Sequence, residues 1–142
     1  MEDFNKLYEF YKNIESGHQK KFNKDTLKKF LEKKHNIFIT TKPIIVGYLV
    51  ASFIVEEIEI ISMAVDLSYR RKGYGDSLIK NIKKLAINKK VKRILLEVSQ
   101  ANYGALKLYK KNDFKSVGIR KNYYTYPNRK GHAEIMCLNL FY

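Results

Sequence analysis

Apolar residues recur at helical spacing in four stretches of the chain, which predicts four amphipathic helices. The first stretch spans residues 3–16, and the second begins at Asn23. The third follows a glycine turn at Gly73 and carries lysines on its outer face, and the fourth spans residues 103–111. Each helix therefore has one apolar face to bury against another layer of the fold.

Six further stretches are rich in β-branched or alternating apolar residues, which predicts six strands. They span residues 37–40, 44–55, 57–65, 91–98, 114–119 and 133–140. The meander of the first three strands implies antiparallel pairing, and the helical crossover before Val91 implies at least one parallel pair. We therefore predict a single α/β (α+β) domain over residues 1–142, with a mixed, mostly antiparallel sheet and helices on both faces.

The composition is typical of a globular protein. A chain of 142 residues with 45% hydrophobic residues is long enough and apolar enough to bury a core. No apolar run reaches the roughly 20 residues of a membrane-spanning helix, and the first residues lack the features of a secretory signal. The single cysteine, Cys137, excludes an internal disulfide. These features predict a cytoplasmic protein without a membrane partner.

The positive charge of the chain is confined to its second half. Residues 1–66 carry 10 Lys and Arg against 10 Asp and Glu, whereas residues 67–142 carry 18 against 4, which accounts for the net charge of +14. Two explanations are open: the lysines only solvate exposed faces, or the charge attracts a polyanion. Nucleic acid, a ribosome and a multiply phosphorylated cofactor would each fit the second explanation.

A basic turn with two glycines lies between a predicted strand and a predicted helix. It reads R-R-K-G-Y-G at residues 70–75. Glycine lets the backbone turn tightly and approach a ligand, and the first N–H groups of a helix have no intrahelical partner. Together with the helix dipole, these N–H groups favour an anion. We therefore predict that this turn and the helix start form a binding site for a phosphate-bearing cofactor, here called the anion seat. The alternative is an ordinary turn with chance glycines; the dinucleotide and Walker patterns are absent.

Three residues further along the chain have side chains suited to acid–base chemistry or ligand binding. Glu97 lies near the end of the 91–98 strand, where apolar neighbours would desolvate the carboxylate and make it a general base; alternatively, it faces solvent or pairs with a lysine. Tyr109, on the apolar face of the last helix, could protonate a leaving group or be an ordinary core residue. Asn102 fits an N-cap of that helix, although its side chain could bind a ligand instead.

These residues stand in a fixed order within longer motifs. M-A-V-D ends one strand, R-x-x-G-x-G follows it, L-E-V lies in the next strand, and A-N-x-x-A-x-x-L-Y-x-x-x-x-F spans the last helix. In this order and spacing the motifs resemble the GNAT acetyltransferases. The segment R-K-N-Y-Y at residues 120–124, with Gly131 before the last strand, is similar to the ribosomal-protein-alanine N-acetyltransferase branch. The resemblance is strong over residues 58–140 and weak over about the first 40 residues.

The resemblance implies a GNAT fold with a splayed pair of central strands and a site for acetyl-CoA beside them. Backbone groups of the first strand would bind the pantetheine arm, and those of the glycine turn would bind the pyrophosphate. The implied cofactor-binding residues are Met63, Ala64, Val65, Arg70, Arg71, Lys72, Gly73, Tyr74, Gly75, Asp76 and Asn102. Glu97 would accept the proton of the incoming amine, and Tyr109 would protonate the departing CoA thiolate. The implied substrate-binding residues, in the acceptor channel, are Tyr123 and Tyr124.

The activity implied by the resemblance is acetyl transfer from acetyl-CoA to the N-terminal α-amine of a protein, with a ribosomal protein as the first candidate. A GNAT that acetylates a small amine or a lysine side chain stays open, as does a non-catalytic basic module that binds RNA or a partner protein. Direct attack by the amine needs no metal. The residues that could bind one are too scattered to form a site: His18, His35, His132 and Cys137.

Two departures from the family pattern bear on these expectations. The family usually has glycine before the phenylalanine that follows the last helix, whereas this chain has Asp113 before Phe114. Aspartate can adopt the left-handed conformation, so we expect the turn to be kept. The N-terminal helices match the family poorly, which leaves the identity of the acceptor open.

Overall fold

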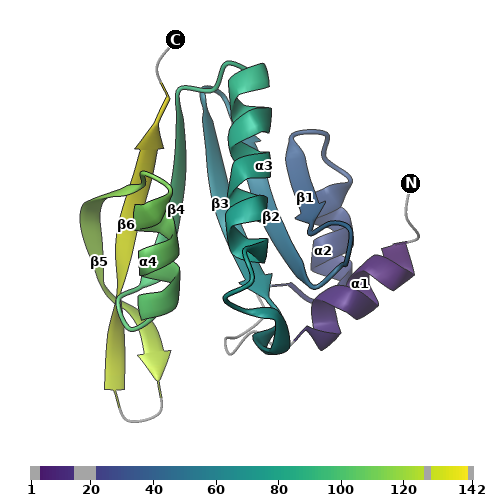
Figure 1. Cartoon of the computed structure of the whole chain (residues 1–142), viewed down its shortest axis with the longest axis horizontal. Coiled ribbons are helices and arrows are strands. Elements are labelled where there is room, and N and C mark those ends of the chain that lie inside the picture. The colour runs from purple at the N-terminus through teal and green to yellow at the C-terminus, as the bar shows by residue number, and fades with distance from the viewer. Residues whose placement is uncertain (1–3, 15–21, 127–128, 141–142) are drawn as a thin grey trace.

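The computed structural model describes residues 4–14, 22–126 and 129–140. Over these residues the chain forms helices and strands in the predicted order (Figure 1). The helices are α1 (Phe4–Asn13), α2 (Lys24–Leu31), the short 3-10 helix η1 (Leu67–Tyr69), α3 (Tyr74–Asn88) and α4 (Tyr103–Lys111). The strands are β1 (Asn36–Thr40), β2 (Gly47–Ile54), β3 (Glu57–Val65), β4 (Arg93–Ser99), β5 (Lys115–Tyr126) and β6 (Arg129–Asn139). None of the helices in these ranges is long and apolar enough to cross a membrane.

The second helix begins where the sequence predicts, because a capping box closes its first turn. Asn23 Oδ1 accepts a hydrogen bond from the backbone N–H of Thr26 at 2.9 Å. Thr26 Oγ1 accepts one in return from the backbone N–H of Asn23, also at 2.9 Å. These reciprocal bonds satisfy N–H groups that the helix itself leaves unpaired.

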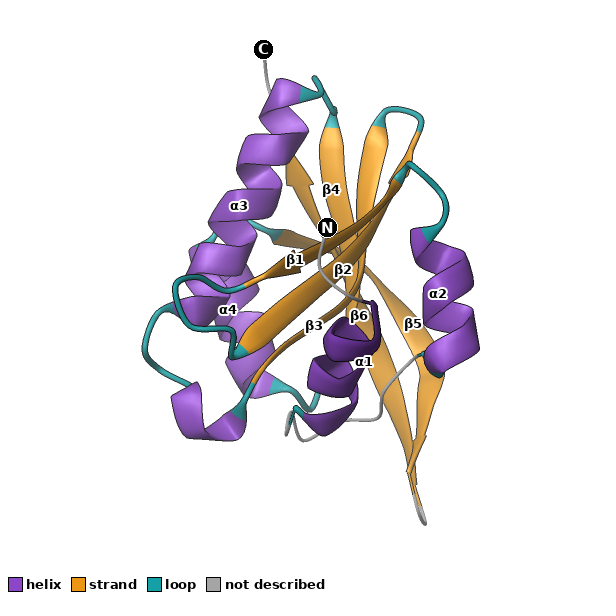
Figure 2. Ribbon diagram, turned by 90° about the vertical axis from the view of Figure 1, so that its right-hand side faces the viewer, coloured by secondary structure: helices purple, strands orange, loops and turns teal. Residues whose placement is uncertain are grey.

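One six-stranded sheet runs through the molecule in the order β1-β2-β3-β4-β6-β5. Neighbouring strands are antiparallel except β3 and β4, which are parallel and joined by the crossover through α3. The predicted mixed, mostly antiparallel sheet is therefore confirmed. Figure 2 shows α3 and α4 on one face of this sheet and α1 and α2 on the other, as predicted.

Two apolar clusters fill the spaces between the sheet and its helices. Strand β2 contributes to both, because successive side chains point to opposite faces: Leu49 belongs to the α3–α4 side and Tyr48 to the α1–α2 side. The second cluster is aromatic, with the ring centroids of Tyr11 and Tyr48 4.9 Å apart. Burial raises the pKa of Tyr48 to about 12, and its hydroxyl is hydrogen-bonded to Ser62 Oγ at 3.1 Å.

The start of β2 differs from the prediction, because a buried hydroxyl closes a loop in front of it. The strand begins at Gly47, whereas the apolar pattern predicts residue 44. Thr41 Oγ1 donates to the Ile44 carbonyl at 2.6 Å and accepts from the Val46 N–H at 2.8 Å. These bonds fold the backbone of the loop onto Thr41 instead of onto a neighbouring strand.

The hairpin of β5 and β6 is longer than predicted. The strands cover Lys115–Tyr126 and Arg129–Asn139, against predictions of residues 114–119 and 133–140. Pairing continues through polar and charged residues, for example between Tyr124 and Gly131. Cross-strand pairing therefore decides the length of a strand where the apolar pattern carries no signal.

A substitution at Val55 tests whether the backbone of the turn between β2 and β3 is strained. It has φ 41°, which is costly for a β-branched residue, and it is 80% exposed. We expect Val55→Gly to raise the free energy of unfolding by about 1 kcal/mol in denaturant titrations, because glycine adopts this backbone freely. Ile119→Gly is the control, because Ile119 is 55% exposed and pairs with Glu134 of β6, and glycine lowers stability within a regular strand. A loss of stability in both variants would refute strain at Val55.

Candidate active site

The parallel strands β3 and β4 separate partway along the sheet (Figure 1). Their pairing ends at Ile60 and Leu96. In the described sheet, β3 then continues to Val65 along β2, and β4 continues to Ser99 along β6. The predicted splayed pair is confirmed, and its facing backbone edges can pair with a bound molecule. The predicted cofactor-contacting residues of the β3 edge are Met63, Ala64 and Val65.

A β-bulge explains where the two strands separate. The β2–β3 register shifts between Val50 and Ala51, which pair with Ser62 and Ile60, so Ile61 is the extra residue. A bulge bends its strand and increases the local twist, and here it does so just after the last pairing between β3 and β4. No glycine marks the bulge, so the residue pattern alone does not reveal it.

The predicted anion seat lies at the start of α3. Gly73 is the N-cap with φ 88°, and Arg71 has φ 61°. A Cβ on Gly73 would meet no described atom within 4 Å, so the left-handed backbone, and not crowding, requires glycine there. The Ser77 N–H donates the first intrahelical bond of α3, to the Gly73 carbonyl at 3.1 Å. The N–H groups of residues 74–76 precede that ladder, which gives the helix start the donors of an anion site.

Other side chains of this loop hold its shape. Arg70 Nε donates to the Val65 carbonyl at 3.3 Å, which ties the loop to the end of β3. The rings of Tyr69 and Tyr74 meet edge to face with centroids 6.2 Å apart, and Lys72 Nζ lies 5.3 Å from the Tyr69 centroid. The side chains of Arg70 and Tyr74 therefore support the loop, while contact of their backbones with a phosphate stays a prediction.

The first turn of α3 is locked to the second half of α4. A Cβ on Gly75 would lie 2.9 Å from Leu108 Cδ2, so glycine lets the two helices approach closely. Asp76 accepts hydrogen bonds from Lys111 Nζ at 2.8 Å and from Asn112 Nδ2 at 2.9 Å. These bonds, the one from Lys111 first, lower the pKa of Asp76 from its ordinary value. The motif predicts that the backbones of Gly75 and Asp76 contact the cofactor. Each of these residues also contacts α4 or the residue after it, which the motif did not reveal.

Glu97 lies on β4 beyond the separation point and forms an ion pair with Arg120 of β5. Arg120 Nη1 donates to both carboxylate oxygens, at 3.0 and 3.1 Å. The buried Leu96 and Val98 point to the opposite face of the strand, whereas Leu95 shares the face of Glu97, so desolvation of the carboxylate by apolar neighbours stays a prediction. The Glu97 side chain is 25% exposed and contacts a cation that lies 23 positions away in the sequence.

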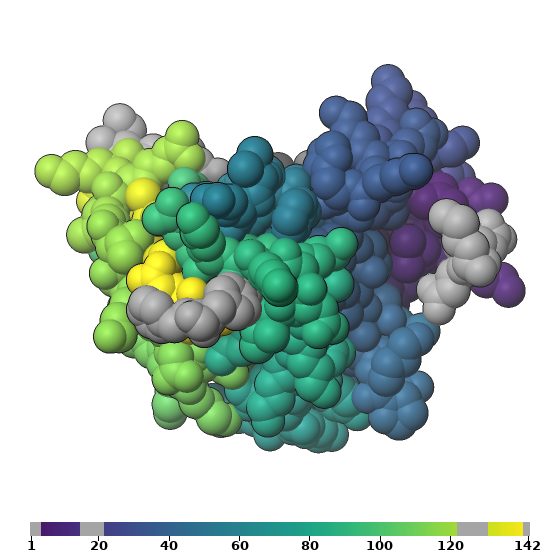
Figure 3. Space-filling view, turned by 90° about the horizontal axis from the view of Figure 1, so that it is seen from above, coloured from purple at the N-terminus to yellow at the C-terminus, as the bar shows by residue number. Residues whose placement is uncertain are grey.

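The sheet face that carries Glu97 is hollowed. The helices α1 and α2 pack on residues of β1, β2 and β3, so they cover only one side of this face. Figure 3 shows the resulting hollow between the blue α2–β1 side and the lime β5 side. An acceptor could therefore approach Glu97 from the face opposite α3 and α4.

Helix α4 carries the other two residues of the predicted site. Asn102 is its N-cap, as predicted, with Oδ1 accepting from the Ala105 N–H at 3.2 Å. Tyr109 is 6% exposed, and its ring centroid lies 5.7 Å from that of Phe114. Tyr109 is thus a buried residue of the α3–α4 core, and a catalytic role for its hydroxyl stays a prediction.

The end of α4 is a Schellman motif. The Phe114 N–H donates to the Tyr109 carbonyl at 3.0 Å, and the Asp113 N–H donates to the Lys110 carbonyl at 3.1 Å. Asp113 has φ 72° and takes the left-handed position that glycine usually fills. The expectation that the turn is kept with aspartate is therefore confirmed.

The remaining predicted site residues, Tyr123 and Tyr124, belong to the far half of β5. The β5–β6 register shifts between Arg120 and Tyr124, so Tyr123 lies within this irregularity and pairing resumes at Tyr124. Their side chains lie outside the described residues, so the acceptor channel stays a prediction.

Cys137 is a core thiol, as predicted. It is 7% exposed in β6, and burial raises its pKa. Within the described ranges, no three His, Cys, Asp or Glu side chains gather as they would around a metal ion. His18 lies outside these ranges.

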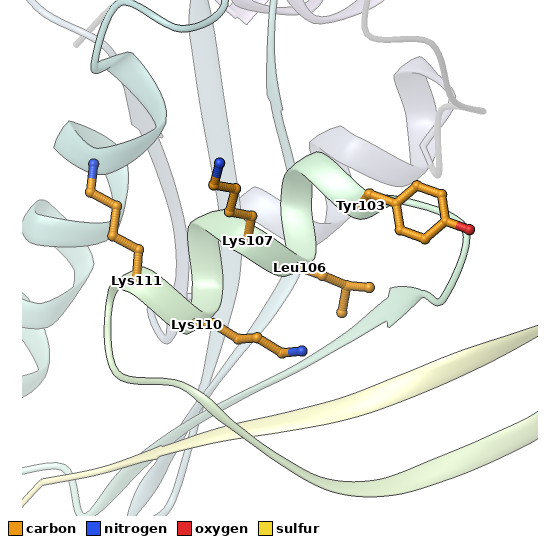
Figure 4. A pocket seen from close by; sticks show the side chains of 5 residues that line it. All are labelled: Tyr103, Leu106, Lys107, Lys110 and Lys111. Carbon is orange, nitrogen blue, oxygen red and sulfur yellow. The ribbon is translucent and has the colours of Figure 1, made fainter.

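A shallow hollow of about 570 Å³ runs along the exposed side of α4. Its lining residues are Tyr103, Leu106, Lys107, Lys110 and Lys111. Figure 4 shows Lys107 and Lys111 pointing toward α3, whereas Lys110 points to the other side of the helix. The lysines give this part of α4 a positive surface.

Comparison with known proteins agrees with the motifs. The sequence model of the Acetyltransferase (GNAT) family matches residues 2–114, including the N-terminal helices where the motif resemblance is weakest. The chain is 30% identical over 141 residues to the ribosomal protein bS18-alanine N-acetyltransferase of Haemophilus ducreyi, covering 98% of this chain and 95% of that protein.

Solved structures share the fold. The ribosomal-protein-S18-alanine N-acetyltransferase from Escherichia coli matches with a TM-score of 0.81 at 23% identity, over 96% of this chain and 87% of that one. Arabidopsis thaliana NAA60 in complex with acetyl-CoA matches with a TM-score of 0.77 at 15% identity, over 97% and 93% of the two chains.

Asp76 should stabilise the fold only while it is ionised. Its pKa is lowered in the folded protein, so its contribution is present above the ordinary aspartate pKa of about 3.9 and is lost as the pH falls through the lower folded value. We expect Asp76→Asn to melt at a lower temperature than the parent at neutral pH, and the gap to close as the pH falls below the lowered pKa of Asp76. Thermal unfolding of both proteins from neutral to acidic pH measures this difference in melting temperature, with Asp113→Asn as the control. A gap that stayed constant with pH would show that charge is not its source.

Proposed function

Because the chain belongs to the GNAT acetyltransferase family, we propose that it transfers the acetyl group of acetyl-CoA to the N-terminal α-amine of a ribosomal protein. The observation that carries this proposal is the opening between β3 and β4, with Glu97 on one side and the start of α3 on the other. The first candidate acceptor is the N-terminal alanine of ribosomal protein bS18, the substrate in the name of the Haemophilus ducreyi relative.

The residues around the opening fit acetyl-CoA. The edge of β3 at residues 63–65 supplies backbone groups for the amides of the pantetheine arm. The N–H groups of residues 74–76 supply donors for the pyrophosphate, and the exposed Arg71 and Lys72 add positive charge. Asn102 Oδ1 accepts from the N–H of residue 105 within α4, and its amide Nδ2 group can donate to the acetyl donor.

The acceptor amine has to lose a proton before it attacks. An N-terminal ammonium has a pKa of about 8, so near neutral pH a base is needed. Glu97 takes that proton, directly or through a water molecule, and the amine lone pair forms a bond to the thioester carbon. Arg120 donates one hydrogen bond to each oxygen of Glu97, and the remaining lone pair of either oxygen can accept from the amine or the water.

The thioester bond then breaks, the CoA thiolate leaves with the electron pair, and the nitrogen of the new amide loses its second proton to solvent. Tyr109 protonates this thiolate, and solvent later restores the proton of Tyr109 and removes the one held by Glu97. The acetyl group passes directly to the amine without a covalent enzyme intermediate. General acid and base steps are each worth roughly 10²–10⁴-fold, and holding amine and thioester together supplies much of the remaining rate.

A peptide panel tests the proposed activity. The protein is incubated with acetyl-CoA and peptides that differ in their N-terminal residue, including the N-terminus of bS18, and CoA release is measured. A matched set has blocked α-amines and free lysines. We expect acetylation of α-amines, fastest on the bS18 peptide. Turnover confined to lysines or small amines would refute the proposed acceptor, and tight CoA binding without turnover would refute the enzyme.

Substitutions separate the proposed base from the proposed acid. We expect Glu97→Gln to lower kcat by roughly 10²–10⁴-fold and to remove the rising limb of the pH–rate profile. We expect Tyr109→Phe to lower kcat while the affinity for acetyl-CoA stays nearly constant. Glu59→Gln, at an exposed position of β3, is the control. An unchanged kcat in Tyr109→Phe would exclude Tyr109 as the acid.

A further inference from the structure

Asp76 occupies a position from which an acidic side chain can block the anion seat. It is the third residue of α3, after the N-cap Gly73. A side-chain acceptor at this position commonly folds back onto the backbone N–H of the N-cap residue. Thr26 does so at the equivalent position of α2, where its Oγ1 accepts from the N–H of the N-cap Asn23 at 2.9 Å. A carboxylate in that orientation would occupy the Gly73 N–H of the predicted pyrophosphate-binding turn and would place a negative charge beside the N–H groups of residues 74–76, where it would repel a phosphate.

In this structure Asp76 is held in the opposite direction, toward α4. Its Oδ2 accepts from Lys111 Nζ at 2.8 Å, and its Oδ1 accepts from Asn112 Nδ2 at 2.9 Å. The Asn112 donor is itself fixed, because the residue is 7% exposed and Nδ2 also donates to the Leu108 carbonyl at 2.9 Å. Both oxygens of Asp76 are therefore engaged at the side of the helix and not at its start.

We propose that Lys111 and Asn112 are positioning residues for the acetyl donor: they hold the Asp76 carboxylate away from the first N–H groups of α3 and keep these groups free for the pyrophosphate. This inference rests on the proposed function, which puts the pyrophosphate at this helix start. Lys111 also neutralises the charge of the Asp76 carboxylate. Without Lys111, this carboxylate would repel phosphates that lie within the Debye length, which is about 10 Å at 0.1 M salt.

A binding cycle tests the inference. Calorimetry at low salt measures the Kd of free CoA for the parent protein, Lys111→Gln, Asp76→Ala and the double variant. We expect Lys111→Gln to weaken CoA binding by about 3- to 10-fold, because a released carboxylate competes with and repels the phosphates. Asp76→Ala should bind CoA at least as tightly as the parent. The double variant should return to the affinity of Asp76→Ala, because it has no carboxylate at residue 76 that could turn toward the start of α3.

The double variant distinguishes positioning from simple bracing. Lys111→Gln and Asp76→Ala both remove the same ion pair, so their melting temperatures should fall together while their CoA affinities move apart. If the pair only braces the two helices, the double variant will bind CoA as weakly as Lys111→Gln, and the inference fails. Lys110→Gln is the matched control, because Lys110 lies one position away on α4 and points to the other side (Figure 4).

A donor without phosphates separates this inference from the proposed function. With acetyl-pantetheine as donor, Lys111→Gln and the parent should acetylate peptides equally, because this donor has no pyrophosphate that the protein must bind. Equal loss with both donors would overturn the inference and leave the acetyltransferase proposal standing. The predicted CoA affinities without turnover on any peptide would support the inference and refute the proposed acceptor.

Discussion

The separation of β3 from β4 is the constraint on which the candidate site depends. Each of these strands is held on its outer side by a long antiparallel partner, and only a short parallel ladder joins them to each other. The bulge at Ile61 bends β3 at the end of that ladder. The sheet therefore opens between β3 and β4, while β3 stays paired with β2 and β4 stays paired with β6. Backbone N–H and C=O groups on the two edges then need other partners, which is what makes the opening a place to bind an extended molecule.

The two helices in front of the opening act as one unit. Leu78 of α3 and Leu106 of α4 belong to the same apolar cluster, and Tyr109 lies within it. Gly75 permits the close approach to Leu108, and Asp76 joins the first turn of α3 to the end of α4. The predicted anion seat and the proposed acid therefore lie at one interface between α3 and α4.

Electrostatics divide the site into two sides. The exposed Arg71 and Lys72 lie in the loop before α3, next to the proposed pyrophosphate site, and they belong to the positive charge carried by residues 67–142. On the other face, Glu97 is paired with Arg120, so a cationic acceptor meets a carboxylate that is already engaged. Exposed pairs such as Lys92 with Glu56, far from both sides, contribute little to stability.

The order of the elements, the family and the local caps could be predicted from the sequence, because they depend on periodicity, motifs and residues close together in the chain. The N-cap Asn102, the left-handed Asp113 and the glycine at residue 73 are of this kind. Tertiary structure decided the partners. Glu97 meets Arg120 across 23 positions and Asp76 meets Lys111 across 35, since strand order and helix packing bring them together. The bulge in β3 and the length of the hairpin likewise follow from strand pairing, which no local pattern of residues encodes.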